Sequence, residues 1–313
     1  MFGCWQPRNA RRSRGSWAFA LGLLAACGHQ DGIVGVQPLG AAGQPAGGFL
    51  EEFVEPNAGW LSDTVLPGAA TSVGDASGSA RDGHWAELRF PGHPEYGANQ
   101  QVGAMFVTQL ATRDRFHFGT YRTRVGFGAC GANEEAVMAF LGYFNDGQDH
   151  DGDGIVDDLE IDVQAACSAP RYLYLTVFTD DEEPPQGNRF RKLTRVVDFA
   201  SGDTFDTVAP DSEQYGPARN DPLLHAPELL APDALYELGF EWHPDSLRFF
   251  LMLGDVERDL WLLSGSDRVP QLPVQVMYNL WHPDTHWYPA EGSADFPTND
   301  VVMHVDWLSF EPE

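Results

Sequence analysis

Polar and apolar residues alternate in short runs from residue 49 to the end of the chain, and clusters of Gly, Pro and Asp separate these runs. A period of two places successive side chains on opposite faces of a β-strand, whereas the helical period of 3.6 is almost absent. We expect strands at 85–90, 119–125, 137–144, 159–164, 172–179, 238–242, 247–253, 274–281 and 301–310. Strands of this length and spacing predict an all-β fold built as an antiparallel β-sandwich.

The region 49–313 shows no internal repeat and no change in composition that would mark a boundary. We therefore expect one domain over these residues. The segment 180–233 is polar and rich in proline, so we expect long loops there.

The first 27 residues have the layout of an export signal. A basic stretch at 8–14 precedes the apolar stretch 18–24, which is too short to span a bilayer. The residues before Cys27 are Leu-Ala-Ala, which is similar to a bacterial lipobox. We interpret 1–27 as a lipoprotein signal peptide and 28–48 as a flexible tether; an ordinary cleavage site with a chance cysteine is the alternative. The chain is then expected in the cell envelope, anchored to the outer membrane only by lipid on Cys27, or secreted.

The remaining cysteines of the exported chain, apart from Cys27, are Cys130 and Cys167. An even pair in an exported protein predicts one disulfide, and two buried thiols are the alternative.

The formal charge of −27 comes without any cluster of Lys and Arg, so we do not expect nucleic acid as a partner. The sequence also lacks a G-x-S-x-G nucleophile turn, an H-E-x-x-H or C-x-x-C zinc motif, and a G-x-G-x-x-G loop opening a helix. These absences argue against lipase, zinc and dinucleotide chemistry.

An acidic loop precedes the predicted strand 159–164 and has the spacing of an EF-hand-type calcium loop. Hard oxygen ligands would come from the side chains of Asp149, Asp151, Asp153 and Asp157 and from the carbonyl of Ile155. Strands rather than helices flank the loop, so we expect an isolated calcium-binding turn; a solvated acidic hairpin is the alternative.

The strand after this loop carries three polar side chains on one face. Strand alternation places Glu160, Asp162 and Gln164 together, with Ile161 and Val163 on the opposite face. Glu160 also falls at the twelfth position of the acidic loop, but alternation assigns it to this polar row. Such a row is costly in a core and is typical of a hydrated cleft. The Cα atoms of Glu160 and Gln164 would be about 13 Å apart, and inclined side chains could approach the roughly 5–5.5 Å of retaining glycosidases.

Five segments, in order along the chain, resemble the motifs of the family-16 glycoside hydrolases, which include laminarinases, lichenases and agarases. They are 118–125 (FGTYRTRV), 160–164 (EIDVQ, against E-x-D-x-E), 240–250 (FEWHPDSLRFF), 278–281 (YNLW) and 305–308 (VDWL). The resemblance implies a concanavalin A-like jelly roll and a retaining glycosidase acting on O-glycosidic bonds of a β-linked polysaccharide. Residues 49–117 match no motif of the family.

Carried over by position, Glu160 resembles the nucleophile and Asp162 the residue that tunes it, and Gln164 stands where the family has its acid/base Glu. Gln cannot give or take a proton, so the proton shuttle is missing. The sequence therefore leaves two alternatives: an impaired or rerouted enzyme, and a carbohydrate-binding pseudoenzyme.

The resemblance also implies sugar contacts from Asn279 and Trp281, and we add Trp287 from the following loop. It implies a structural calcium near Asp306, although a buried Asp that caps a turn would look the same. We expect Trp242 and Trp307 in the core, and a monomer whose partner is a polysaccharide.

Overall fold

The computed structural model describes residues 47–55, 59–64, 69–75, 80–92, 105–152, 156–169, 171–179, 191–199, 201–206, 212–213, 219–220, 234–287 and 292–313. The predicted signal peptide, Cys27 and nearly all of the predicted tether lie outside these residues. No helix among the described residues is long and apolar enough to cross a membrane.

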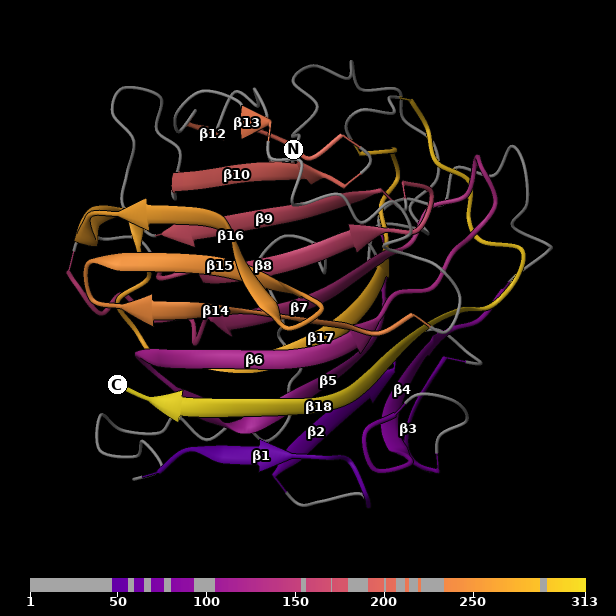
Figure 1. The fold of residues 1–313 in the computed structure, drawn as a ribbon, viewed down its shortest axis with the longest axis horizontal. Helices are drawn as coiled ribbons and strands as arrows, with labels where there is room; N and C mark the ends of the chain where they lie inside the picture. Colours follow the sequence, from indigo (N-terminus) through magenta and orange to yellow (C-terminus); the bar gives the residue numbers. More distant parts are fainter. Residues whose placement is uncertain are drawn as a thin grey trace, which may run out of the picture.

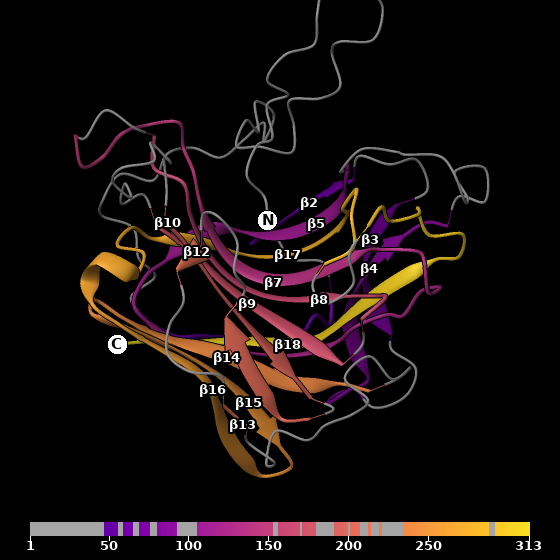
Figure 2. The same ribbon diagram turned by 90° about the horizontal axis from the view of Figure 1, so that it is seen from above.

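The described residues form two β-sheets that pack face to face, as Figures 1 and 2 show. Sheet A, nearer the viewer in Figure 1, has eight strands: β3 (Ala70–Asp75), β4 (His84–Phe90), β18 (Val301–Pro312), β6 (Gly119–Gly126), β14 (Tyr236–His243), β15 (Ser246–Leu253), β16 (Val256–Ser264) and, paired to β18, β1 (Phe49–Glu51).

Sheet B lies behind sheet A and has ten strands. They are β2 (Trp60–Thr64), β5 (Met105–Phe116), β17 (Val274–His282), β7 (Val137–Phe144), β8 (Leu159–Ala166), β9 (Tyr172–Thr179), β10 (Arg191–Asp198), β11 (Asp203–Asp206), β13 (Arg219–Asn220) and, paired to β10, β12 (Ser212–Glu213). The strands β5, β17, β7 and β8 curve together in Figure 2, which makes the outer face of sheet B concave.

The pairings are antiparallel in both sheets apart from the short parallel contact of β12 with β10. The described part contains no α-helix, and its one helical element is a 3-10 turn, η3 (Ser266–Arg268). The predicted all-β jelly-roll sandwich is therefore confirmed.

The core lies between the sheets and is filled with aromatic and branched side chains. The ring of Phe140 on β7 lies 5.4 Å from that of Tyr278 on β17 and 5.6 Å from that of Phe240 on β14, centroid to centroid. The contact of Phe140 with Phe240 stabilises the packing of sheet B on sheet A. Trp242 and Trp307 are both buried, as the sequence predicts.

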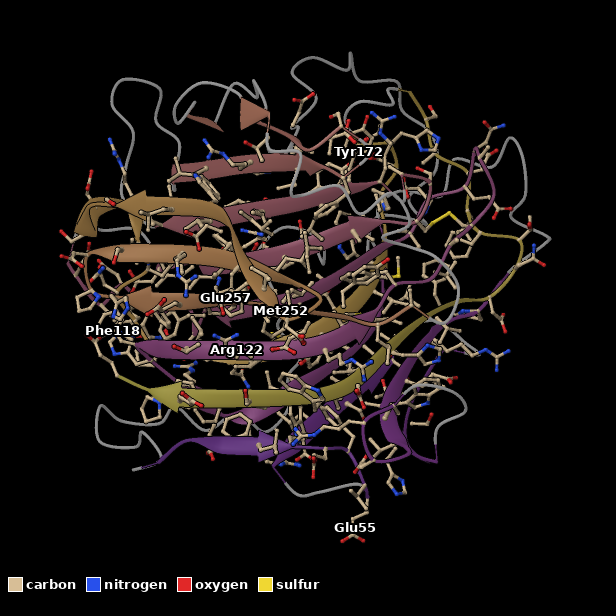
Figure 3. The ribbon with its side chains drawn as sticks, viewed as in Figure 1. Glu55, Phe118, Arg122, Tyr172, Met252 and Glu257 are labelled. Carbon is tan, nitrogen blue, oxygen red and sulfur yellow. A yellow bond between two sulfur atoms is a disulfide. The ribbon has the colours of Figure 1, made fainter. Side chains whose placement is uncertain are left out.

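The outer face of sheet A carries a network of ion pairs. Arg122 on β6 contacts Glu257 on β16 at 2.6 Å, and Arg248 on β15 contacts both Glu241 and Glu257 at 2.7 Å. Figure 3 shows Arg122 and Glu257 side by side on this face. The charged side chains of this face are thus paired with one another. The polar row predicted for a site lies on β8 and therefore belongs to sheet B.

The segment 180–233, in which we expect long loops, also contains the strands β10 to β13, which were not predicted. On the core-facing side of β10, Arg195 replaces an apolar residue between Leu193 and Val197, and its guanidinium lies 5.4 Å from the centroid of the Trp261 ring. The buried arginine breaks the apolar alternation by which a strand is recognised in the sequence. The strands β1, β2, β3, β5 and β16 were also not predicted.

Candidate active site on the outer face of sheet B

The central strand β8 presents Glu160, Asp162 and Gln164 on the outer face of sheet B, as alternation predicts. Ile161 and Val163 point the other way and belong to the core between the sheets. Asp162 is buried, whereas Glu160 and Gln164 are half-buried. The three polar side chains therefore share one surface, with Glu160 and Gln164 accessible from it.

A hydrogen bond joins the carboxyl groups of Asp162 and Glu160. Burial is the main cause of the raised pKa of both groups: that of Glu160 rises to about 7, and that of Asp162 rises well above its ordinary value, also because of the Glu160 charge. Two adjacent buried carboxyls share one proton, since both cannot ionise together cheaply. Asp162 holds that proton and donates it to Glu160, which stays available as a carboxylate.

Asp158 continues the row on the other side of Glu160. It is hydrogen-bonded to Tyr143 on the neighbouring strand β7 and to Asn145, and burial raises its pKa. The negative charge of Asp158 also raises the pKa of Glu160. Three carboxyls, Asp158, Glu160 and Asp162, thus follow each other along one strand face.

Gln164 lies at the other end of the row, between Ala139 on β7 and Tyr174 on β9. Ala139 is in turn paired with Asn279 on β17, and Asn279 with Gln109 on β5. Because Ala139 has a small side chain, the surface is recessed between Gln164 and Asn279. The buried Oδ1 of Asn279 and Oε1 of Gln109 accept no hydrogen bond from the described residues, so both are suited to accept one from a ligand hydroxyl.

Aromatic side chains gather next to the Gln164 end. Trp287, in the loop after β17, lies 5.6 Å from Trp281 and 4.9 Å from Tyr174 between ring centroids, the latter edge to face. Tyr172, labelled in Figure 3, packs in the same group. The structure therefore places Trp281 and Trp287 together, near Asn279, where flat faces could stack on sugar rings.

A buried polar cluster of Glu135, Ser168 and His286 lies next to this aromatic group. The Glu135 carboxylate accepts a hydrogen bond from the backbone amide of Ser168 at 3.1 Å and contacts the His286 ring at 3.1 Å. The predicted disulfide between Cys130 and Cys167 is present, with Cα atoms 5.3 Å apart. It ties the segment before β7 to the end of β8 and so fixes the position of Glu135 and Ser168.

The acidic loop before β8 is described only in part, because Asp153 and Ile155 lie outside the described residues. Asp149 accepts a hydrogen bond from the amide of Gly152 at 2.6 Å, and Asp157 accepts one from His150 at 2.8 Å. Asp151 is exposed. Among the described residues the carboxyls of Asp149, Asp151 and Asp157 do not form a cluster of metal-ligating oxygens, so the calcium site stays a prediction.

Asp306 on β18 is buried, and both of its carboxylate oxygens have partners. One accepts a hydrogen bond from the amide of Arg81 at 2.8 Å, and the other pairs with the Arg124 guanidinium at 2.5 Å. Arg124 supplies positive charge at the position where the family resemblance implies a calcium ion. The described donors therefore do not form a calcium site there.

Lys192 is a charged residue of this face that was not predicted. Lys192 on β10 is buried on the outer face of sheet B, and its charge lowers the pKa of both Glu160 and Asp162. Because β10 was not recognised as a strand, Lys192 was not placed. It is the only lysine of the chain, and this rarity was the feature of the sequence that could have drawn attention to it.

No protein-family model matches the chain, and no curated protein matches it either. Among solved structures, the chain is similar to a Bacillus licheniformis beta-glucanase at 13% identity, with 86% of this chain and 100% of that chain covered and a TM-score of 0.49. A prokaryotic beta-1,3-1,4-glucanase (lichenase) derived from a mouse hindgut metagenome has 15% identity, coverage of 85% and 99%, and a TM-score of 0.48. A glycoside hydrolase family 16 endo-glucanase from Bacteroides ovatus has 10% identity, coverage of 84% and 99%, and a TM-score of 0.48. Likenesses at this level identify no activity, so function is argued below from the side chains of the outer face of sheet B.

Proposed function

We propose that this chain is a family-16-like glycoside hydrolase that forms a covalent intermediate on Glu160 with a β-linked polysaccharide. The observation that carries the proposal is the row Glu160–Asp162–Gln164 on the concave face of sheet B, with Asp162 hydrogen-bonded to Glu160. Sugar contacts come from Asn279, Trp281 and Trp287.

In the first step the Glu160 carboxylate attacks the anomeric carbon, and the bond to the leaving oxygen breaks. The proton donated by Asp162 holds Glu160 in place and stabilises its charge. The leaving oxygen of a polysaccharide needs a proton as it departs, and Gln164 cannot supply it, so this proton has to come from water. Loss of acid catalysis slows such steps by about 10²–10⁴-fold, so we expect slow turnover of ordinary glycosidic bonds.

The second candidate is a carbohydrate-binding protein without turnover. The amides of Gln164, Asn279 and Gln109 lie in one row across β8, β17 and β5, with Ala139 between the first two. Amides bind hydroxyl groups without transferring protons, so this row favours binding as much as chemistry.

A fluorinated dinitrophenyl β-glycoside separates the two candidates, because its leaving group departs without a proton. We expect the gluco- or galacto-configured 2-deoxy-2-fluoro probe to label the protein once, on the peptide that contains Glu160, as detected by mass spectrometry. Glu160→Gln is the matched control and should stay unlabelled. A protein that binds β-glucan or galactan oligosaccharides yet is never labelled would be a binding protein.

We also propose that the acidic loop with Asp149, Asp151 and Asp157 binds calcium, and that the chain is exported with lipid on Cys27. Calcium bound only by the folded protein raises the melting temperature. We expect millimolar Ca²⁺ to raise it by several degrees relative to EDTA in the wild type, and much less in Asp149→Asn/Asp151→Asn. Equal shifts in both proteins would contradict the assignment of this loop.

A further inference from the structure

Lys192 is the only lysine among the 19 basic residues of Lys and Arg type in the chain, and it is 5% exposed. A buried ammonium group is costly unless opposite charge compensates it. The compensating charges can be identified from the strands around it.

The strand register places Lys192 in one row with Glu160. Lys192 on β10 pairs with Phe178 on β9, and Phe178 pairs with Glu160 on β8. The Lys192 Nζ atom lies 5.1 Å from the centroid of the Phe178 ring. Two strand spacings of about 4.8 Å separate the backbones, so the lysine chain extends across the Phe178 ring toward the carboxyl row.

The other groups around Glu160 are acidic or neutral in the described part of the chain. Asp162 lies next to it on β8 and Asp158 lies just before that strand. Tyr143 faces it from β7, and β9 contributes the apolar Phe178. Arg115, in the same row beyond Gln275, is paired with Asp146 at 3.7 Å. Among these side chains Lys192 is the cation whose charge acts on both Glu160 and Asp162.

We propose that Lys192 is the positioning residue of the nucleophile: its ammonium group keeps Glu160 ionised and oriented in a row of three carboxyls. This inference rests on the proposed role of Glu160. It accounts for a lysine that is buried two strands away from Glu160, and it assigns Lys192 no contact with the departing oxygen.

The first test follows the rate of labelling by the fluorinated dinitrophenyl glycoside between pH 5 and pH 9. In the wild type the rate should rise with a midpoint near pH 7, where Glu160 ionises. Without the ammonium group the midpoint should rise by about one pH unit. Lys192→Met should therefore label about five- to tenfold more slowly at pH 6.5 and approach the wild-type rate at pH 9.

Lys192→Arg is the conservative control, and it should keep the midpoint close to that of the wild type. A purely structural role for Lys192 would lower the rate at every pH without moving the midpoint, and that result would overturn the proposal. Melting curves of both variants establish that they are folded.

A second measurement does not depend on labelling. Carboxyl carbons of ¹³C-labelled Glu are titrated by NMR, with the Glu160 signal assigned from its absence in Glu160→Gln. A higher midpoint in Lys192→Met than in the wild type supports the role of Lys192, and equal midpoints overturn it. If no protein is labelled by the glycoside, the proposed function fails, while the titration still decides whether Lys192 sets the charge of Glu160.

Discussion

The ionised form of Glu160 is needed for its proposed role, but the surroundings of Glu160 disfavour that form. As the proposed nucleophile it has to be a carboxylate, yet burial and the neighbouring Asp158 raise its pKa to about 7. The same environment that tunes the group for reaction therefore makes its ionised form costly to fold.

This conflict predicts a change in stability when Glu160 is replaced by Gln. A carboxyl whose pKa rises from 4.5 to about 7 on folding contributes stability below pH 4.5, and that contribution is lost as the pH rises through 7. Glu160→Gln should thus be more stable than the wild type at pH 8, by roughly 3 kcal/mol. The difference should vanish near pH 4. Urea unfolding at both pH values measures it, and a variant less stable at pH 8 would contradict the burial of this charge.

At the scale of elements, the end of β8 depends on the bond between Cys130 and Cys167. The bridge closes a loop with a sequence separation of 37 residues that contains β7, the acidic loop and β8. It also anchors the segment that carries Glu135, the partner of Ser168 and His286.

Replacing both cysteines by alanine should lower the free energy of unfolding by about 2–4 kcal/mol, because the unfolded chain gains freedom over this loop. Chemical unfolding of the double variant and the oxidised wild type, side by side, measures the difference. Unchanged stability would mean that β7 and β8 hold this segment without the bridge.

Strands that form continuous apolar or alternating runs could be predicted from the sequence, whereas β10 could not. The expected bounds of β7 and β9 match the structure. β10 escaped recognition because Arg195 lies on its core-facing side and Lys192 on its outer side, so neither face reads as apolar. A charged side chain can be buried in a sheet when residues on distant strands compensate its charge. The local sequence pattern does not show which residues those are.

At the scale of the whole molecule, the sandwich brings distant segments onto one concave face. Glu160 and Asp162 on β8, Asn279 and Trp281 on β17, and Lys192 on β10 come from three parts of the chain. The row on β8 could be predicted, because its residues follow one another at alternate positions. The effect of Asp158 and Lys192 on the pKa of Glu160 could not be predicted, since it depends on burial and on the register between strands.

We expect this face to be a retaining glycosidase site that lacks the acid at position 164. The most direct measurement is reducing-sugar release from a panel of β-glucans and galactans, with calcium, by the wild type, Gln164→Glu and Gln164→Glu/Glu160→Ala. We expect Gln164→Glu to exceed the wild type by about 10²–10⁴-fold on at least one polysaccharide, and the double variant to be inactive. Gln164→Glu no more active than the wild type on a polysaccharide that both bind would contradict the account.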